Sequence, residues 1–152
     1  MFYDNGLRFE CQRCRYCCGV EPGFVFLTED DAGRASKELG MSRDEFLDKC
    51  CRKIDNGDHY LVSLKEKKNY DCIFLSDYGC GIYKARPVQC STYPFWPEVM
   101  KSERAWRNEG SYCPGIGKGD VVPREEIEAR IKEKEGQNLL RIPKDRGHLK
   151  LF

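Results

Sequence analysis

This sequence of 152 residues has no long apolar run, and its first residues do not combine a basic start with an apolar stretch. The first absence excludes a transmembrane helix, which needs about 20 consecutive and mostly apolar residues. The second predicts a chain without a secretory signal, since such a signal carries an apolar stretch of about 7–15 residues after a basic start. We therefore expect a cytoplasmic protein with no membrane partner.

The chain is also short of net charge and of apolar side chains. Its 26 basic and 25 acidic residues leave a net charge of +1. A dedicated nucleic-acid binder is usually clearly basic, so we expect no nucleic-acid partner. Leu, Ile, Val and Phe make up only 33 of the 152 residues, close to the composition at which chains stop folding on hydrophobic burial alone. Something besides apolar packing is therefore expected to hold the fold.

What the sequence has in abundance is cysteine, with ten residues. In a reducing cytosol thiols stay reduced, so clustered cysteines there indicate metal ligands or redox groups. Four of them form the run Cys11-x2-Cys14-x2-Cys17-Cys18, which lies among Gln, Arg and Gly with no apolar face to serve. Two overlapping Cys-x2-Cys steps let a tight loop direct thiolates to one point, as zinc knuckles and iron–sulfur loops do. The run therefore predicts the centre of a metal site.

A tetrahedral thiolate site needs four ligands, and the run alone supplies three well. Cys18 is a poor fourth ligand because adjacent residues usually point in different directions. In bacterial ferredoxins, three cysteines at this spacing serve one cluster while a later cysteine before a proline comes from elsewhere, and Cys113-Pro114 fits that pattern. The simplest division leaves a second group of four: Cys18, Cys72, Cys80 and Cys90. One cluster surrounded by several of these cysteines is the alternative.

The remaining two cysteines, Cys50 and Cys51, fall in the apolar stripe of a helix predicted to open at Ser42 and to end at Asn56-Gly57. On such a face a cysteine is usually a small hydrophobic residue, so we do not expect them to bind metal.

Short elements are predicted along the rest of the chain. Thr28, followed by acidic residues, predicts the start of a helix that Gly40 ends, and Pro87 predicts the start of a short helix that carries Cys90. Residues 60–64 and 70–75 are rich in β-formers and predict a hairpin, residues 99–106 predict another, and residues 123–140 predict a charged helix. We expect an α+β fold, a small single domain of short helices and β-hairpins organised around a multi-cysteine metal site. The domain is expected to span residues 1–152, with a core over about 9–140 and a loosely held tail over 141–152.

A few other side chains are candidates for the surroundings of the metal. Aromatic residues exclude water from a cluster, and an arginine can donate to sulfur or offset the charge of four thiolates. Arg86, Tyr93 and Phe95, with Trp96 beside them, are the candidates, and ordinary core packing is the alternative for the aromatic residues.

The segment Phe9-x-Cys11-x2-Cys14-x2-Cys17-Cys18 resembles the signature of the CxxCxxCC, or YkgJ-like, cysteine-cluster family. The resemblance covers about residues 9 to 130 and departs mainly at Ser91, a place often held by Arg. It implies metal binding, since members are described as zinc- or iron-chelating domains and some as iron–sulfur oxidoreductases. The other matching blocks are Cys72-Ile73-Phe74-Leu75, Cys80-x-Ile82-Tyr83-x2-Arg86-Pro87-x2-Cys90-x2-Tyr93-Pro94-Phe95, and Cys113-Pro114-Gly115-Ile116-Gly117.

Two functions remain in competition at this point. The favoured hypothesis is an iron–sulfur protein with a [4Fe-4S] cluster, which serves electron transfer or redox support of a partner enzyme or redox protein. The alternative is a structural zinc domain acting as an interaction module, because tetrahedral sulfur sites suit Zn²⁺ nearly as well and metal-binding energy becomes folding energy. The third possibility is an enzyme in which one metal position stays open to substrate, and it ranks last because no general base or nucleophile is recognisable beside the thiolates.

Overall fold

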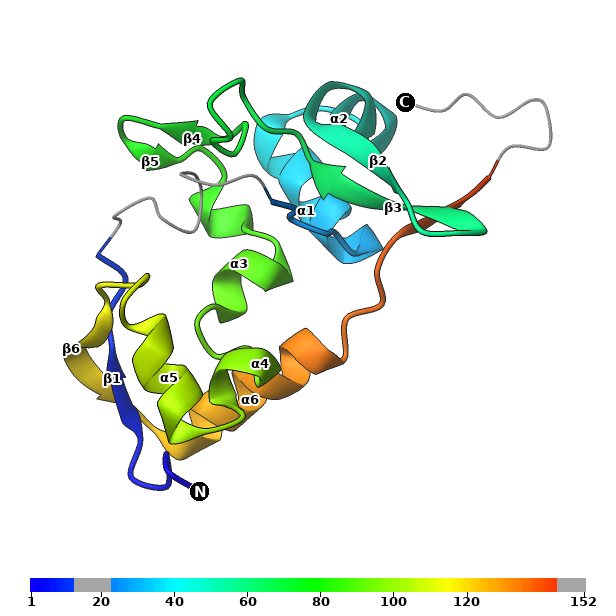
Figure 1. Ribbon diagram of the computed structural model, residues 1–152. Helices are drawn as coiled ribbons and strands as arrows, with labels where there is room; N and C mark the ends of the chain where they lie inside the picture. Colours follow the sequence, from blue (N-terminus) through cyan, green and yellow to red (C-terminus); the bar gives the residue numbers. More distant parts are fainter. Residues whose placement is uncertain (13–22, 145–152) are drawn as a thin grey trace. The chain divides into compact units, whose positions relative to one another are not determined.

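The computed structural model describes residues 1–12 and 23–144, and the chain packs as two compact units. Unit 1 comprises Met1–Cys17 and Thr92–Gln137, and unit 2 comprises Cys18–Ser91 and Asn138–Phe152. Helices and small antiparallel sheets occur in both units (Figure 1), which confirms the α+β class expected from the sequence. Within the described residues, no helix combines the length and the apolar character that crossing a membrane requires.

Unit 1 is built on a two-stranded antiparallel sheet of β1 (Leu7–Phe9) and β6 (Ile116–Val122). Its helices are α4 (Pro97–Met100), α5 (Glu103–Glu109) and α6 (Arg124–Glu135). Large apolar side chains from these elements and from the N-terminal segment form one buried core: Tyr3, Phe95, Val99, Met100, Trp106 and Ile127.

The hairpin predicted over residues 99–106 is wrong, because α4 and α5 occupy this region. Local chemistry explains the helices. Pro97 stands in the first turn of α4, where its missing N–H costs nothing. The Ser102 hydroxyl accepts a hydrogen bond from the Ala105 N–H over 3.0 Å, which caps the start of α5.

Unit 2 carries a three-stranded sheet in the order β2-β3-β7, with β2 at Cys51–Asp55, β3 at His59–Leu64 and β7 at Arg141–Pro143. Figure 1 shows α1 (Glu29–Leu39) and α2 (Arg43–Cys50) packed together beside this sheet. The buried core combines both layers: Leu27, Ala32, Ala35, Phe46, Leu47, Cys50, Cys51, Val62, Leu64 and Ile82.

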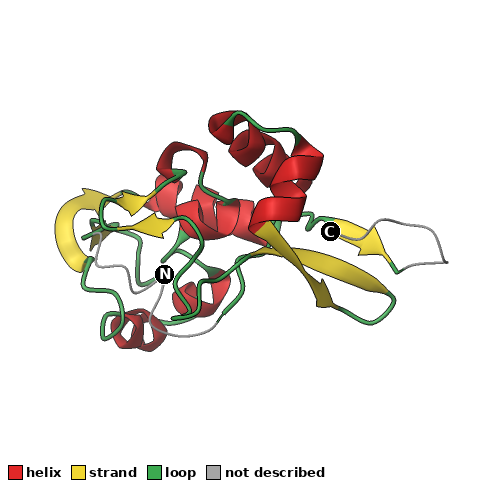
Figure 2. Cartoon of the chain, turned by 90° about the horizontal axis from the view of Figure 1, so that it is seen from above, coloured by secondary structure: helices red, strands yellow, loops and turns green. Residues whose placement is uncertain are grey.

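The helix predicted to run from Ser42 to Asn56 ends at Cys50, and β2 begins at the next residue. The pair Asn56-Gly57 joins β2 to β3, the long hairpin of Figure 2, and Gly57 has a φ of 90°. Asn-Gly is a strong hairpin signal for this reason, since glycine adopts a positive φ without strain. Strand β3 pairs with β2 rather than with residues 70–75. The chain does turn back after β3 as predicted, but through an antiparallel bridge between Glu66 and Cys72, with the Ile73 N–H donating to the Lys65 carbonyl over 3.0 Å.

The second half of unit 2 holds short elements. Strands β4 (Leu75–Ser76) and β5 (Gly79–Cys80) form a small hairpin, followed by the 3₁₀ helix η1 (Tyr83–Ala85). Helix α3 (Val88–Thr92) comes next, and its last residue falls in unit 1.

Residues 141–152 were predicted to form a loosely held tail, but the first three of them form strand β7. Strand β7 pairs with β3, and the Lys144 ammonium lies 2.8 Å from the Asp55 carboxylate. Residues 145–152 lie outside the described residues.

Candidate metal centre

Cys11 and Cys113 lie at the same end of the β1–β6 pair in unit 1. The register pairs Phe9 with Ile116, and the Glu10 N–H donates to the Gly115 carbonyl over 3.1 Å. In an antiparallel ladder the next residue of one strand meets the preceding residue of the other. Cys11 therefore leaves the ladder beside Cys113–Pro114, although about a hundred residues separate the two cysteines in the sequence.

Glycine makes this close approach possible. A Cβ atom at Gly115 would lie 2.3 Å from the Glu10 carbonyl oxygen and 3.0 Å from the Phe9 ring. One at Gly119, whose φ is 72°, would lie 2.5 Å from the Glu10 Cβ. The glycine-rich stretch after Cys113 thus brings the two backbones together, and its residues from Ile116 onward belong to β6.

The backbone around Cys113 is fixed by hydrogen bonds. Its N–H donates to the Glu109 carbonyl over 2.9 Å, and its carbonyl accepts from the Ile116 N–H over 3.2 Å. The Tyr93 hydroxyl donates to the Glu109 carboxylate, so the residue that anchors Cys113 is itself held. The Cys113 side chain is buried, with 9% exposure. A buried and well-anchored thiol is what a ligand of a water-sensitive cluster requires.

Cys72 and Cys80 come together in unit 2. Cys80 pairs with Leu75 across the β4–β5 hairpin, and the Leu75 N–H donates to the Cys72 carbonyl over 2.9 Å. Both side chains pack against the apolar core of the unit. Burial raises the pKa of the Cys72 thiol, the Phe74 N–H that donates to its sulfur opposes this, and the nearby Cys80 thiol raises the pKa further.

The Phe74 contact is the arrangement a thiolate ligand needs. A bound cation deprotonates a coordinating thiol outright, which outweighs the effect of burial. Backbone N–H donors to sulfur then stabilise the thiolate and tune a bound cluster. The donor set at Cys72 and Cys80 thus fits zinc or iron, both of which bind thiolates in tetrahedral sites.

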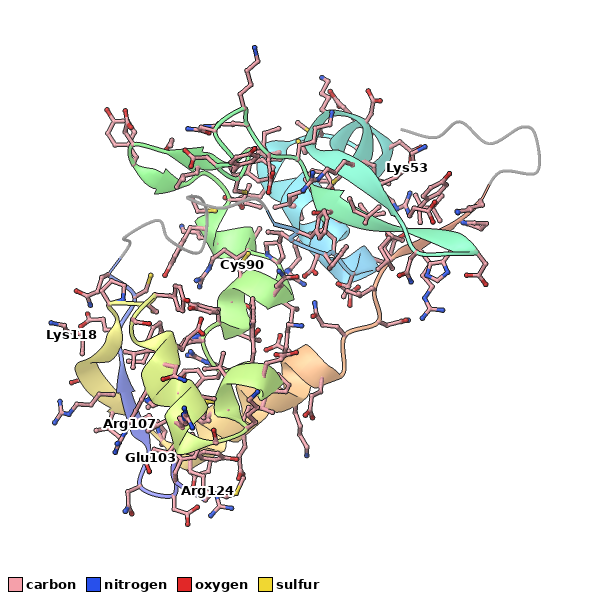
Figure 3. All side chains as sticks on the ribbon, in the orientation of Figure 1. Lys53, Cys90, Glu103, Arg107, Lys118 and Arg124 are labelled. Atoms are coloured by element: carbon pink, nitrogen blue, oxygen red, sulfur yellow. The ribbon has the colours of Figure 1, made fainter. Side chains whose placement is uncertain are left out.

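Cys90 lies on α3, as predicted, and Figure 3 shows it there. Its N–H donates to the Pro87 carbonyl over 2.9 Å, which places Cys90 in the first turn of the helix. Cys14, Cys17 and Cys18 lie outside the described residues. Among residues 1–12 and 23–144, no group of three or more Cys, His, Asp or Glu side chains gathers in a way that could hold a metal ion.

Cys50 and Cys51 are buried in the core of unit 2, with exposures of 6% and 1%. Burial raises the pKa of both thiols, that of Cys51 to about 12. A thiol with such a pKa stays protonated at neutral pH and is a poor nucleophile. The two residues act as small hydrophobic side chains, Cys50 at the end of a helix and Cys51 at the start of a strand.

The residues expected around the metal have clear contacts of their own. The Arg86 guanidinium lies 3.9 Å from the centre of the Tyr83 ring, and its Nε donates to the Tyr83 carbonyl over 2.9 Å. Phe95 is fully buried in unit 1, where it stacks on Trp106 and meets the Phe9 ring edge-on. Through Phe9, two residues before Cys11, the Phe95 ring supports the strand that leads to the cysteine run.

Comparisons with known proteins agree with this chemistry. The family model CxxCxxCC, described as "Putative zinc- or iron-chelating domain", matches residues 10–114. The chain is 31% identical over 123 residues to the uncharacterized protein MJ0661 of Methanocaldococcus jannaschii, which covers 78% of this chain and 63% of that protein. It is 27% identical over 137 residues to the uncharacterized protein MJ0939 of the same organism, which covers 85% of this chain and 45% of that protein. The chain thus spans less than two thirds of each relative, and no solved structure matches it.

Proposed function

Because the chain belongs to the CxxCxxCC family of zinc- or iron-chelating domains, we propose that it holds an iron–sulfur cluster, [4Fe-4S], through cysteine thiolates. The cluster would supply one-electron chemistry, for electron transfer or for redox support of a partner enzyme or redox protein. The chain supplies the thiolates, the N–H donors to sulfur and the apolar surroundings that keep water away.

One observation carries the proposal. The β1–β6 pair brings the first cysteine of the run beside Cys113–Pro114, the remote cysteine before a proline that ferredoxin-type spacing calls for. Zinc knuckles do not need a distant Cys-Pro, so this pairing favours iron over zinc.

The thiolates are proposed to divide into two sets of four: Cys11, Cys14, Cys17 and Cys113 in the first, and Cys18, Cys72, Cys80 and Cys90 in the second. Among the described residues, Cys11 and Cys113 belong to unit 1, and Cys72, Cys80 and Cys90 belong to unit 2, which supports this division. One cluster with the other cysteines around it is the alternative.

The family match extends through both units, since residues 10–114 include parts of each. We therefore propose that the units form one cysteine-cluster domain. Its setting would be a reducing compartment, where thiolates remain available for metal.

The test is purification of the full chain without oxygen, followed by absorption spectroscopy and analysis of iron, zinc and acid-labile sulfide. A brown protein with four iron and four sulfide per cluster, and broad absorption at about 400 nm, supports a [4Fe-4S] cluster. Stoichiometric zinc in a colourless protein overturns this proposal. Cys11→Ser and Cys72→Ser are expected to lower the metal content, one in each unit. Cys50→Ser is the matched control, because Cys50 is a buried thiol outside the proposed set.

A structural zinc domain is the second candidate, and the small cores of the two units favour it. Among the described residues, the apolar core cluster of unit 1 contains six buried side chains. Metal-binding energy would supplement such a core directly, as it does in zinc fingers. Under this reading the protein binds zinc in the purification above and serves as an interaction module.

A further inference from the structure

Helix α3, which carries Cys90, is held by hydrogen bonds at the two residues that precede this cysteine. Val88 contributes its backbone N–H, and Gln89 contributes its side-chain amide. The Val88 N–H donates to Oδ1 of Asp31 over 3.1 Å. The Gln89 amide donates from Nε2 to the Phe24 carbonyl over 2.7 Å and accepts at Oε1 from the Phe26 N–H over 3.0 Å. A helix of five residues is not stable alone, so these contacts decide where it lies.

Asp31 is a fully buried carboxylate that links α1 to the start of α3. Its Oδ2 accepts from the Thr28 N–H over 2.9 Å in the capping box of α1. Its Oδ1 accepts from Arg34 over 2.6 Å, and the same guanidinium group donates to the Arg86 carbonyl over 3.3 Å. Because the carboxylate is paired and hydrogen-bonded, burial does not leave its charge uncompensated. Asp31 thus fixes α3 relative to α1.

Gln89 makes the second anchor, to a different part of the unit. Its amide group donates one hydrogen bond to the Phe24 carbonyl and accepts one from the Phe26 N–H, as the backbone of a neighbouring strand would. That segment is itself held on β3, since the Val25 N–H donates to the Ser63 hydroxyl over 3.0 Å and Phe26 bridges Ser63. In the sequence, Phe24 comes six residues after Cys18, the last cysteine of the run. Gln89 therefore ties the residue beside Cys90 to the segment that follows Cys18.

We propose that Asp31 and Gln89 are positioning residues for the metal site of unit 2, because they fix the helix that carries Cys90. The inference rests on the proposed function, in which Cys90 is a ligand. Neither Asp31 nor Gln89 is a proposed ligand, so their role is to act on the metal through Cys90. A ligand on a helix that is already fixed loses less conformational entropy when it binds metal. The metal is then expected to dissociate more slowly.

The test compares the full-length, metal-loaded protein with three variants. Gln89→Met keeps the side-chain length and removes both hydrogen bonds, and Asp31→Asn removes the charge that holds Val88 and Arg34. Ser42→Ala removes the N-cap hydrogen bond of α2, in the same unit but away from α3, and controls for general destabilisation. The measurements are the thermal midpoint, the rate of metal transfer to a chelator (bathophenanthroline disulfonate for iron, pyridylazoresorcinol for zinc), and the visible circular-dichroism spectrum.

We expect Gln89→Met to release metal about 10- to 100-fold faster than the unchanged chain, the range seen when partners of metal ligands are lost. Asp31→Asn is expected to act in the same direction, and Ser42→Ala to release metal at the unchanged rate. Equal release rates for Gln89→Met and Ser42→Ala at matched thermal midpoints would overturn the inference, as would an unchanged Gln89→Met.

A fourth variant, Cys90→Ser, separates this inference from the proposed function. If Cys90→Ser loses metal while Gln89→Met behaves as the unchanged chain does, only the positioning role is wrong. If Cys90→Ser keeps the full metal content, Cys90 is not a ligand, and both the positioning role and the proposed second set of ligands fail, whereas the first set is unaffected.

Discussion

The Glu10 N–H donates a hydrogen bond to the Gly115 carbonyl over 3.1 Å, and this bond extends the β1–β6 ladder to the cysteines. Cys11 follows Glu10 directly, and Cys113 precedes Gly115 by two residues. One end of this two-stranded sheet therefore brings together two proposed ligands that come from the two separate segments of unit 1. This relationship depends on a backbone contact that only glycine permits at residue 115.

Substitution of Gly115 by alanine is expected to weaken both the fold of unit 1 and its metal binding. The new Cβ would lie 2.3 Å from the Glu10 carbonyl, so β1 must move away from β6. Overpacking of this kind costs about 1–3 kcal/mol. Metal content and the urea unfolding midpoint measure the two effects. Gly33→Ala is the control, because its Cβ meets nothing within 4 Å and alanine favours a helix by about 1 kcal/mol over glycine. An unchanged metal content in Gly115→Ala would contradict the role of this contact.

The buried thiol of Cys51 is expected to make the fold less stable at high pH. Burial raises its pKa in the folded chain to about 12, whereas the ordinary value is 9.0. The unfolded chain loses this proton first, so the stability present below pH 9 declines as the pH rises towards 12. The free energy of unfolding, measured by urea titration across this interval, is expected to fall less steeply in Cys51→Ala. Equal slopes in the two chains would show that Cys51 does not carry the effect.

Removal of the metal is expected to destabilise the fold. Anything that binds only the folded state stabilises it, by about 4 kcal/mol when its free concentration exceeds the Kd a thousandfold. A chelator should therefore lower the thermal midpoint measured by calorimetry, and reloading with zinc, or with iron and sulfide under reducing conditions, should restore it. Cys50→Ala should respond to the chelator as the unchanged chain does. A midpoint that a chelator leaves in place, despite full removal of metal, would exclude metal as a source of folding energy.

Ser102→Ala is expected to destabilise unit 1 by about 1 kcal/mol, because the first turn of α5 loses its side-chain cap. Urea unfolding followed by the fluorescence of Trp106, which lies in this helix, measures the change. Ser111→Ala is the matched control. Ser111 is exposed, lies just after the end of α5, and its hydroxyl donates to the Asn108 carbonyl rather than capping the first turn. The cap assignment is wrong if both variants have the same stability.

Local signals in the sequence predicted several elements well. Thr28 with its acidic residues and Gly40 marked the two ends of α1, and Gly40 adopts the left-handed conformation that such an end requires. Pro87 marked the start of α3, with Cys90 on it. These predictions succeeded because capping residues and helix-ending residues act through hydrogen bonds and backbone torsion angles within a few residues of the chain. The reciprocal bond from Asp31 to Thr28 was within reach of the same reasoning, whereas nothing around Gln89 indicated its role.

Other predictions failed where a local pattern allowed two structures. The apolar spacing over residues 46–54 fits a helix, but Asn56-Gly57 favoured a hairpin, and pairing with β3 converted Cys51–Asp55 to a strand. Tertiary pairing overrides a weak helical preference in this way. Residues 99–106 are helical because Pro97 and Ser102 favour helix starts, and most of the residues between Val99 and Trp106 are good helix formers.

The sequence by itself determined the chemistry of this protein, because ligand type and close spacing are written in the run from Cys11 to Cys18 and in Cys113-Pro114. Metal chelation follows from thiolates that a tight loop can direct to one point. Only the tertiary structure decided which remote cysteines lie beside which segment. That depends on strand register, on the close approach at Gly115 and on side-chain anchors such as Asp31 and Gln89. Contacts between residues far apart in the chain leave no periodic signal in it, so the fold alone reveals them.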